Sequence, residues 1–404
     1  MATDEWAPAW DLEINAGLKF PPEHRQLVRS IKVLADGDGC DELTIVADAR
    51  DPDTRAWRFV GEALLAPGNR VTVFLGWGLE LEAVQRFIIV EEHVSYGERG
   101  HPQVTIRGLS ADRRLAAWEG ARAWEGPIAD SDIVRELADT HQLLVTGDSV
   151  ADTPSRGASG KAARKKPRNT SDLTFLHQLA VANGYGSPFV RYDIETDSDV
   201  LYFRPLEAGD PLTFTYDPVE AGSDLTCGDC YSFEANLDLS GVASEVEVIG
   251  WDPDTQQPVA IVMKVEDAGQ DPTVYEGADA NAVAGYMVKS GAEMVVRVFS
   301  DGDEPEPKKR DAIHVPHVHT IDEATDYARR WIATRNQAFL TGRAKIKGNA
   351  AVWKGQVHEF VGIAPVHVGL WEVVRAEHTL DERGYVVDLD LARVLEDAAE
   401  PVEG

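Results

Sequence analysis

Apolar and polar residues alternate in short runs near both ends of this 404-residue chain. The stretch 372–393, EVVRAEHTLDERGYVVDLDLAR, is an apolar run, a polar turn that ends at Gly384, and a strictly alternating segment. Alternation over this length is typical of a β-strand with one buried face. We therefore predict a β-hairpin, and expect its buried face to contain Tyr385, Val387, Leu389 and Leu391.

The region 25–110 has the same character. Short runs that alternate or are rich in β-branched residues are separated by Gly, Pro and Asp, which favour turns. The expected strands lie at 43–51, 70–78, 86–96 and 102–110. Together they predict an antiparallel barrel or sandwich of about 100 residues.

The pattern becomes helical in the middle of the chain. Apolar residues at helical spacing predict one helix over 131–144, capped by Ser131 or Asp132, and a second over 171–184. Ser171 is suited to begin the second helix, and Gly184 is suited to follow its last residue in a left-handed conformation. A strand is expected at 199–205.

The remaining segments are mixed. Residues 212–265 are β-like, with a turn at 252–255. A helix is expected near 277–291 and another over 321–340, where Thr320 and Glu323 form a capping box. In the second of these helices we expect Ala324, Tyr327, Ala328, Trp331, Ile332 and Arg335 to lie on one side. Residues 343–393 are again β-like.

The terminal hairpin has a counterpart at 90–109, VEEHVSYGERGHPQVTIRGL, since both contain Glu-His followed by Glu-Arg-Gly. A glycine precedes each hairpin, with Gly68 standing 25 residues before His93 and Gly355 standing 23 residues before His378. Order and spacing agree, whereas identities are few. We interpret this as an internal duplication of one β module; two unrelated hairpins with glycine-rich turns are the alternative.

Composition adds several limits. The formal net charge is −30, which reflects either an adaptation for solubility or salt tolerance, or a surface past which polyanions slide without sticking. No apolar run is long enough for a transmembrane helix and the N-terminus lacks the features of a signal peptide, so we expect cytoplasmic synthesis and no membrane insertion. The three cysteines are Cys40, Cys227 and Cys230. Cys227 and Cys230 have metal-knuckle or redox spacing but no second pair, and we interpret them as structural or incidental.

A basic cluster interrupts this acidic chain. Residues 151–171, ADTPSRGASGKAARKKPRNTS, contain almost no apolar anchor and are expected to form a mobile loop. Its basic residues suit either a solvated loop or a tether to an acidic partner surface. The candidate contacts are Lys161, Arg164, Lys165, Lys166 and Arg168. Trp251, beside the predicted turn at 252–255, is a further candidate, either for an interface or for a core.

Four stretches resemble the phage late-control D family of tail hub proteins, which includes the hubs of contractile tails and the N-terminal part of VgrG spikes. They are SDLTFLHQLAVANGY (171–185) with VLYFRP (200–205), VASEVEVIGWDPDTQQPV (242–259), ARRWIATRNQAFLTGRAKIKGN (328–349) and WEVVRAEHTLDERGYVVDLDLAR (371–393). Residues 25–115 fit the family's first barrel by pattern more than by motif. The usual Gly-Asp-Pro step before the last barrel is replaced by KGNAAVWKGQ (347–356).

The resemblance implies two tube-like antiparallel β-barrels, related here by internal duplication, with an inserted α/β region. We expect a first barrel over 1–115, an α/β domain over 116–211 that contains the basic loop 151–171, and the first part of the second barrel over 212–265. An α/β region over 266–342, the rest of the second barrel over 343–395 and an acidic tail over 396–404 complete the expected organisation.

The family role implied is a homotrimeric baseplate hub without enzymatic activity, cofactor or bound metal. Such a hub adapts a sixfold inner tube to a separate threefold spike, contacts baseplate wedge proteins, and lets DNA or cargo pass through an acidic lumen. It would assemble in the cytoplasm and become part of a phage tail or an injection particle, between which the sequence does not choose. The alternative is an enzyme that degrades polysaccharide with paired carboxylates. We interpret His314, His317 and His319 as loop residues rather than metal ligands.

Overall fold

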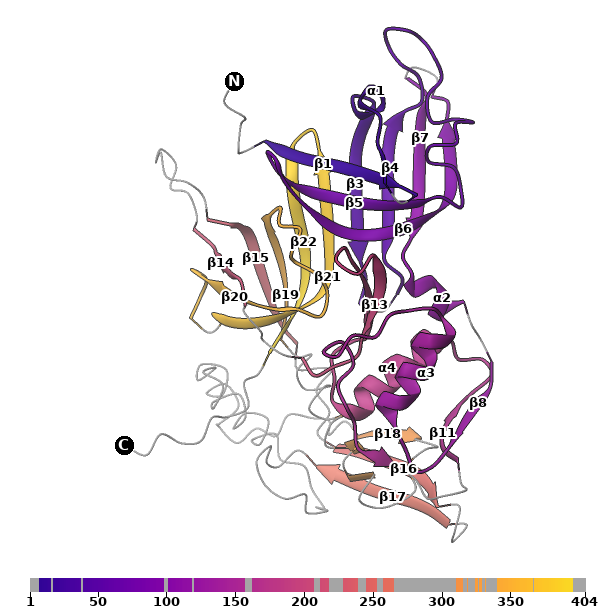
Figure 1. Ribbon diagram of the computed structural model, residues 1–404. Coiled ribbons are helices and arrows are strands. Elements are labelled where there is room, and N and C mark those ends of the chain that lie inside the picture. Colours follow the sequence, from indigo (N-terminus) through magenta and orange to yellow (C-terminus); the bar gives the residue numbers. More distant parts are fainter. Residues whose placement is uncertain are drawn as a thin grey trace.

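The structure is a computed structural model of the 404-residue chain. It describes residues 7–15, 17–37, 39–97, 101–117, 120–156, 162–206, 211–217, 228–238, 245–252, 257–264, 310–314, 318, 324–325, 327–328, 331, 340–365 and 367–394. Most of these residues lie in antiparallel β-sheet with few helices, which confirms the β-rich class (Figure 1). None of the helices in the described ranges is long and apolar enough to cross a membrane.

One sheet of 13 strands dominates the molecule. From the first part of the chain it contains β1 (Pro8–Ile14), β2 (Leu18–Lys19), β3 (Val28–Ala35), β4 (Glu42–Asp48), β5 (Arg70–Trp77), β6 (Glu80–Ser95) and β7 (Gln103–Leu109). From the second part it contains β14 (Thr213–Thr215), β15 (Cys230–Leu237), β19 (Leu340–Lys347), β20 (Val357–Val361), β21 (Gly369–Asp381) and β22 (Gly384–Arg393). The strands predicted at 43–51, 70–78, 86–96 and 102–110, and the terminal hairpin, are confirmed.

Two groups of six strands in this sheet have the same order. In what we call the N-terminal module, neighbouring strands follow the order β3-β4-β7-β6-β5-β1. In the C-terminal module the order is β15-β19-β22-β21-β20-β14. Numbering the six strands of each module along the chain gives the same sequence of neighbours, 2-3-6-5-4-1, in both.

Irregularities of pairing also fall at matching places. The first paired strands shift register at Arg29 in β3 and at Tyr231 in β15. The long hairpins shift register at Val90 in β6 and at Val374 in β21. A β-bulge inserts one unpaired residue and bends its strand, so shared bulges give both modules the same local curvature.

The glycines that precede the two hairpins make the same hydrogen bonds. Gly68 N donates to Ile89 O at 2.8 Å, and Gly355 N donates to Val373 O at 2.8 Å. Ile89 and Val373 each donate in return to the carbonyl of the residue after the glycine, at 2.9 and 2.8 Å. Both glycines have positive φ, 98° and 74°, which a glycine adopts without steric penalty. The predicted equivalence of Gly68 and Gly355 is therefore confirmed.

The predicted match between the two hairpin histidines, His93 and His378, is wrong by one residue. If the two bulges are superposed, His93 corresponds to Glu377 rather than to His378. His93 is exposed, whereas His378 is fully buried and lies 2.9 Å from the Tyr385 hydroxyl. Since a shift of one residue moves a side chain to the opposite face of a strand, the shared Glu-His dipeptide is not a structural equivalence.

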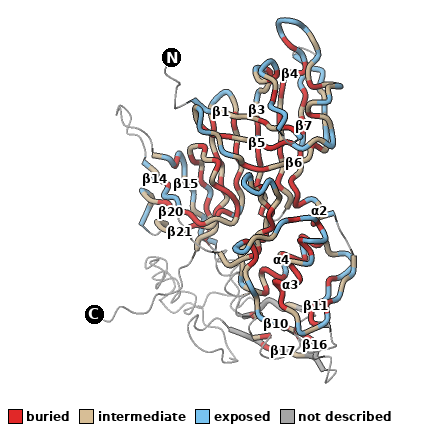
Figure 2. The backbone as a smooth tube through the Cα atoms, in the orientation of Figure 1, coloured by how far each residue is buried: buried red, intermediate tan, exposed pale blue. Residues whose placement is uncertain are grey.

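The two modules are joined directly, edge to edge. β3 pairs antiparallel with β21 over five residue pairs, from Ala35–Ala376 to Ile31–Leu380. A single apolar core follows from this union, since buried side chains of both modules belong to one continuous cluster (Figure 2). Trp77 adds a contact between the modules, because its Nε1 donates to Gly348 O at 2.8 Å.

Below the N-terminal module in Figure 1, helices pack around a second apolar core. This unit contains α2 (Asp112–Ala116), β8 (Arg122–Glu125), β9 (Ile128–Ala129), α3 (Asp130–Thr140), β10 (Ser155–Arg156), β11 (Ala162–Lys166), α4 (Asp172–Asn183), β12 (Phe189–Asp193) and β13 (Ser198–Tyr202). The short helix α1 (Pro22–Arg25) lies instead in the N-terminal module.

The helix ends agree with the prediction in one case and differ in the other. Ser171 caps α4 by accepting a hydrogen bond from Thr174 N, and Gly184 ends the helix with φ 69°. In α3 the N-cap is Ala129 and makes no side-chain cap, so Ser131 and Asp132 both lie inside the first turn. Ser131 bonds across to Thr153 instead.

A third, three-stranded sheet contains β16 (Glu245–Asp252), β17 (Gln257–Lys264) and β18 (Arg310–His314). The prediction placed all of 212–265 in the second barrel, but only β14 and β15 join the long sheet. The other two strands of that range, β16 and β17, pair antiparallel with each other and pack against residues of the predicted helix 321–340. Within that range residues 324, 325, 327, 328 and 331 are helical, whereas Leu340 already begins β19. Ala324, Tyr327, Ala328 and Trp331, predicted to lie on one side of the helix, all contribute to this small core. The helix expected near 277–291 and the turn at 253–255 lie outside the described residues.

Candidate functional site

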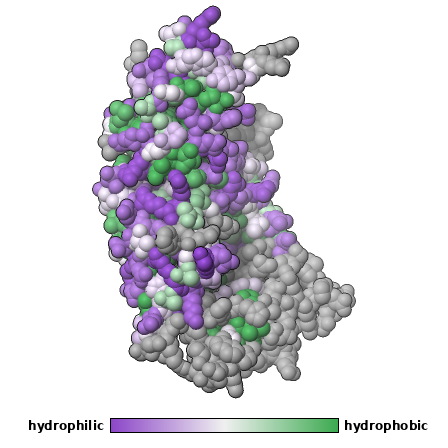
Figure 3. Space-filling view, turned by 90° about the vertical axis from the view of Figure 1, so that its right-hand side faces the viewer, coloured by the Kyte–Doolittle hydropathy of each residue, from purple (hydrophilic) through white to green (hydrophobic). Residues whose placement is uncertain are grey.

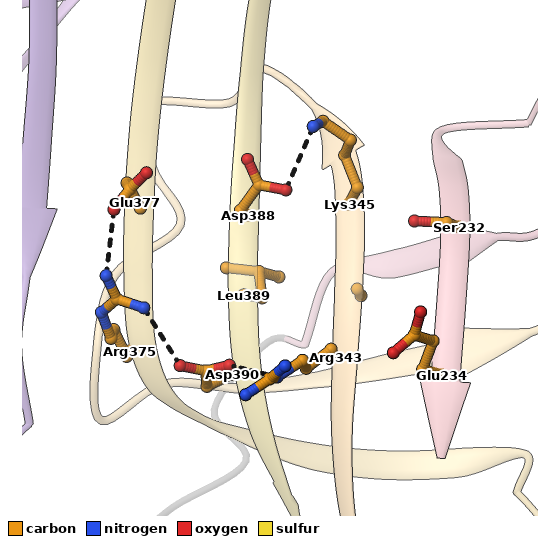
Figure 4. A pocket seen from close by; sticks show the side chains of 10 residues that line it. Ser232, Glu234, Arg343, Lys345, Arg375, Glu377, Asp388, Leu389 and Asp390 are labelled. Carbon is orange, nitrogen blue, oxygen red and sulfur yellow. Dashed lines mark hydrogen bonds and ion pairs between the residues drawn. The ribbon is translucent and has the colours of Figure 1, made fainter.

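A ladder of opposite charges covers the solvent face of the C-terminal module (Figure 4). Because side chains alternate along a strand, the residues between the buried ones in β19, β22 and β21 all point to this face. Lys345 lies 3.2 Å from Asp388 on the neighbouring strand, and Arg343 lies 3.3 Å from Asp390. Arg375 bridges Asp390 at 3.3 Å and continues the ladder onto β21. These side chains line a shallow hollow of about 420 Å³.

The ladder continues across the junction into the N-terminal module. Lys32 on β3 reaches Glu377 on β21, with Nζ and Oε1 2.7 Å apart. On the next strands Arg107 joins Glu42 at 3.2 Å and Glu91 at 3.1 Å. The face therefore runs without interruption over eight strands, from β15 to β6.

Among the ion-paired side chains of this face, charge is balanced. Its ion pairs join five basic residues to five acidic ones, namely Lys32, Arg107, Arg343, Lys345 and Arg375 with Glu42, Glu91, Glu377, Asp388 and Asp390. Exposed pairs of this kind contribute little to stability, about 0–1 kcal/mol each. The paired side chains make this surface polar while adding no net charge to it.

Buried ion pairs have a different location and role. Lys354, in the segment between β19 and β20, donates to Asp41 Oδ1 at 2.6 Å and lies 3.4 Å from Asp112 Oδ2. Asp41 precedes β4 and Asp112 begins α2, so one buried ammonium connects both modules and the helical unit. Lys354 also donates to Asp36 O at 2.7 Å.

Burial dominates the proton affinities in this cluster. Burial raises the pKa of Asp41 to about 7, although Lys354 opposes the shift. Burial alone would lower the pKa of Lys354, but the two carboxylates outweigh it and hold that pKa above its ordinary value. The lysine is therefore charged, and it compensates carboxylates that would otherwise be strongly unfavourable in the core.

The predicted basic loop contains a strand, β11, and two of its five candidate residues are buried. The Arg164 guanidinium makes two bonds to the Asp130 carboxylate, at 2.7 and 2.8 Å. Lys166 donates to Asp172, whose other oxygen lies 2.7 Å from His141 Nε2. Although burial tends to raise the pKa of Asp172, these hydrogen bonds hold it below its usual range.

These two residues are therefore not free to bind a partner. The loop prediction failed because the strand's anchors are ion pairs with distant carboxylates rather than apolar side chains. Lys165 and Arg168 are exposed, as the prediction requires. Lys161 lies outside the described residues, and Trp251 lies in β16 but its side chain is outside the described set.

The cysteines and histidines that the sequence offers as chemical candidates do not form a site within the described residues. Burial raises the pKa of the Cys230 thiol to about 11, so this cysteine is unreactive at neutral pH; Cys227 is outside the described residues. His314 ends β18 rather than lying in a loop, and His317 and His319 are not described. The described ranges contain no group of three His, Cys, Asp or Glu side chains arranged to hold a metal.

Sequence reasoning missed the residues that join the parts. Lys354 is a single lysine among apolar residues in AAVWKGQ, and its partners Asp41 and Asp112 are more than 200 residues away. His378 was noticed only as part of a repeat. Its burial with Trp353 and Tyr385 could have been inferred from its place in the alternation, on the same face as Ala376 and Leu380.

Comparison with known proteins identifies the fold. No family model and no curated protein sequence matches the chain. Among solved structures, a tail protein from Neisseria meningitidis MC58 superposes with a TM-score of 0.62 at 12% identity, over 96% of this chain and 97% of that one. The 43 kDa tail protein of prophage MuSo2 from Shewanella oneidensis gives 0.56 at 12% identity, over 96% and 98%.

A third similar structure comes from a secretion machine. It is an E. coli component of the type VI secretion system, described as structurally similar to the T4 bacteriophage tail proteins gp27 and gp5. Its TM-score is 0.50 at 11% identity, over 95% of this chain and 77% of that one. The chain thus has the fold of phage tail proteins and of their counterpart in a secretion system, and the resemblance that its motifs indicate is confirmed at the level of the fold.

Proposed function

We propose that this protein is the structural hub of a contractile tail or of a tail-like injection particle, acting as a homotrimer without enzymatic activity. The single observation that carries the proposal is the repeated module. Two six-stranded groups with the same neighbour order, two matching bulges and the same glycine-anchored turn lie edge to edge in one chain. The simplest origin of this arrangement is duplication of one tube-like β-barrel.

Two like modules per chain have a consequence for symmetry. Three chains around a threefold axis present six similar modules, so one face of the ring can stack on a sixfold tube while the other receives a threefold partner. The resemblance to tail hub proteins supplies the proposed partners: a sixfold inner tube protein, a trimeric spike, and wedge proteins around the ring.

The balanced charge ladder supports a passage role. If the eight-stranded polar face lines the lumen, its basic side chains are already paired with carboxylates on the same face, and few are available to hold phosphates. DNA or protein cargo would then pass without strong retention. Those same pairings argue against the enzyme alternative, since the carboxylates on this face contact basic side chains rather than one another.

Native mass spectrometry of the purified chain, followed by affinity purification of a tagged copy from cells that assemble particles, tests the proposal. We expect a mass of three chains, and co-purification with a ring-forming tube protein and a spike. The identity of the co-purified proteins also assigns the particle as a phage tail or an injection system. A chain that stays monomeric and isolated under both conditions would overturn the proposal.

A further inference from the structure

The way in which the two modules pair inside one chain suggests how one chain could pair with the next. Inside the chain, β20 covers one edge of β21 only up to Glu372, and β3 takes over that edge from Ala376 to Leu380. The strand β21 is thus shared between its own module and the next. If the modules are equivalent, β6 in the N-terminal module has the same divided edge.

The edge of β6 is divided in the same way, but only its first part is paired with a described strand. β5 covers the edge of β6 only up to Ile88. Beyond the bulge at Val90, the segment 92–96 consists of the last four residues of β6 and Tyr96, which follows the strand. Residues 92–95 pair with β7 on one side, and no strand in the described part of the chain pairs with the segment on the other. An exposed edge of this kind is a template for another strand.

The complementary edge is at the opposite end of the long sheet. β15 occupies the position in the C-terminal module that β3 occupies in the N-terminal one. Its outer edge has a single bridge, Tyr216 with Cys230, at its first residue. Along the rest of β15 no described strand covers that edge, and Leu237 at its far end is 41% exposed.

We propose that these two edges pair between copies of the chain, β15 of one copy with segment 92–96 of β6 of the next, in the antiparallel register of β3 with β21. The inference rests on the proposed trimer and specifies its interface. Superposing the bulges fixes the register, and the expected opposite pairs are Leu237–Glu92, Asn236–His93, Ala235–Val94, Glu234–Ser95 and Phe233–Tyr96.

The side chains on the two edges complement each other in this register. On the inner face Tyr96, which is 70% exposed, comes opposite Phe233, and Val94 comes opposite Ala235. Aromatic and β-branched cross-strand pairs stabilise a sheet. On the outer face Glu234 takes the place of Lys32, and His93 takes the place of Glu377. Where Lys32 and Glu377 form an ion pair, the junction would place Glu234 and His93 at the corresponding positions, with the acidic side chain now on the other strand.

The arrangement is head-to-tail, because each copy contributes one edge of each kind. Such an interface either closes into a ring or continues as a filament. The edges lie at opposite ends of the eight-strand face, as the strand order requires (Figure 1). On the side that faces right in Figure 1, hydrophobic residues form small patches among hydrophilic ones (Figure 3). That composition suits a junction made mainly by backbone pairing.

Engineered disulfides test the register. In the variant His93→Cys with Asn236→Cys, the two cysteines would lie directly opposite each other, with their Cα atoms about 4.5–5.5 Å apart, which is within the Cα separation of about 4.4–6.8 Å that a disulfide bridges. We expect a covalent trimer on a non-reducing gel, which collapses to single chains with reductant. The control Glu91→Cys with Asn236→Cys moves one cysteine by two residues, to about 7–8 Å between Cα atoms, and should cross-link far less. The unmodified chain reports any background from its own cysteines.

The outcomes separate this inference from the proposed function. A trimer by native mass spectrometry that does not cross-link at 93–236 overturns the junction and leaves the hub proposal intact. Cross-linked chains longer than three support the junction but contradict a closed trimer. A chain that neither cross-links nor forms a trimer at any concentration tested contradicts both.

Charge reversal gives a second, independent readout. Glu234→Lys places a lysine near His93, and we expect assembly to weaken by about two- to five-fold per junction, the range for one exposed ion pair. Adding His93→Glu recreates the Lys32–Glu377 polarity and should restore assembly. If the double variant assembles no better than the single one, the two side chains are not partners.

Discussion

The N-terminal and C-terminal modules have the same framework but differ in what covers one edge. In the C-terminal module β3 covers the outer half of β21, and the side chains behind it, including His378, are completely buried. In the N-terminal module none of the described strands covers the matching half of β6, and Val94, at the position of His378, is only partly buried. The same framework thus has this edge paired in one module and, among the described strands, unpaired in the other, which is the difference on which the proposed head-to-tail junction rests.

A second difference lies at the outermost strands. β1 runs antiparallel to β5 over seven residue pairs, whereas β14 runs parallel to β20 over three. The direction of the outermost strand therefore differs between the modules. The four strands β3, β4, β7 and β6 and their counterparts β15, β19, β22 and β21 are arranged alike in both, and these eight strands form the continuous polar face.

The largest expected effect concerns the buried lysine that joins the modules. Lys354→Met leaves Asp41 and Asp112 without their cation, and removing one partner of a buried ion pair typically destabilises by about 3–5 kcal/mol. Chemical denaturation measures this loss. Because the pKa of Asp41 is already about 7, the loss should be smaller at pH 5, where the carboxyl is neutral, than at pH 8. A loss that is equal at both pH values would contradict the role given to charge.

The two equivalent glycines give a matched comparison. Both Gly68→Ala and Gly355→Ala put a side chain at positive φ, which destabilises by about 1–2 kcal/mol. At Gly355 the added Cβ would also lie 2.8 Å from the Phe189 ring, whereas at Gly68 nothing lies within 4 Å. We expect Gly355→Ala to lose about 1–3 kcal/mol more than Gly68→Ala because of that clash. Equal losses would mean that Phe189 moves away freely.

The buried histidine of the C-terminal module, His378, should make the stability of the fold sensitive to acid. Burial lowers the pKa of His378 to about 3, against an ordinary 6.5, so the unfolded chain binds a proton that the folded chain does not. Stability is full above pH 6.5 and falls as the pH drops toward 3, by up to about 1.4 kcal/mol per pH unit for this group. In His378→Gln that component of the slope should vanish, whereas the unmodified chain should keep it. Urea titrations at pH 4 to 7 measure both.

The smallest effect is expected on the exposed ladder. Lys345→Met removes the partner of Asp388 at a solvent-exposed site and should change stability by less than about 1 kcal/mol. It is the matched control for Lys354→Met. A larger effect is expected on the binding of polyanions to this face, which should weaken because Asp388 loses its cation and the face becomes more acidic. A loss comparable to that of Lys354→Met would contradict the distinction between the two kinds of ion pair.

The sequence predicted the parts whose order is local. Alternation located the hairpins, and the Ser171 and Gly184 signals located α4, because each depends on neighbouring residues. Long-range contacts could not be read in this way. Neither the pairing of β3 with β21 nor the anchoring of Arg164 by Asp130 produces a local pattern in the sequence, so the local pattern around β11 predicts a loop where the structure has a strand.

The repeat shows the same limit within one motif. Gly68 and Gly355 were matched correctly because a glycine required by positive φ is a physical constraint. His93 and His378 were mismatched because a shared dipeptide is not, and a bulge that changes the register by one residue is invisible in the letters. The bulges at Val90 and Val374, known only from the structure, supply the correct alignment.

Electron microscopy of the purified assembly, viewed along its symmetry axis, tests the central claim most directly. Six modules of one kind, contributed by three chains, should appear as a ring of six similar lobes around a central opening, with true threefold symmetry when the helical units are included. A particle with three lobes, or with two dissimilar lobes per chain that do not alternate around a closed ring, would contradict the account.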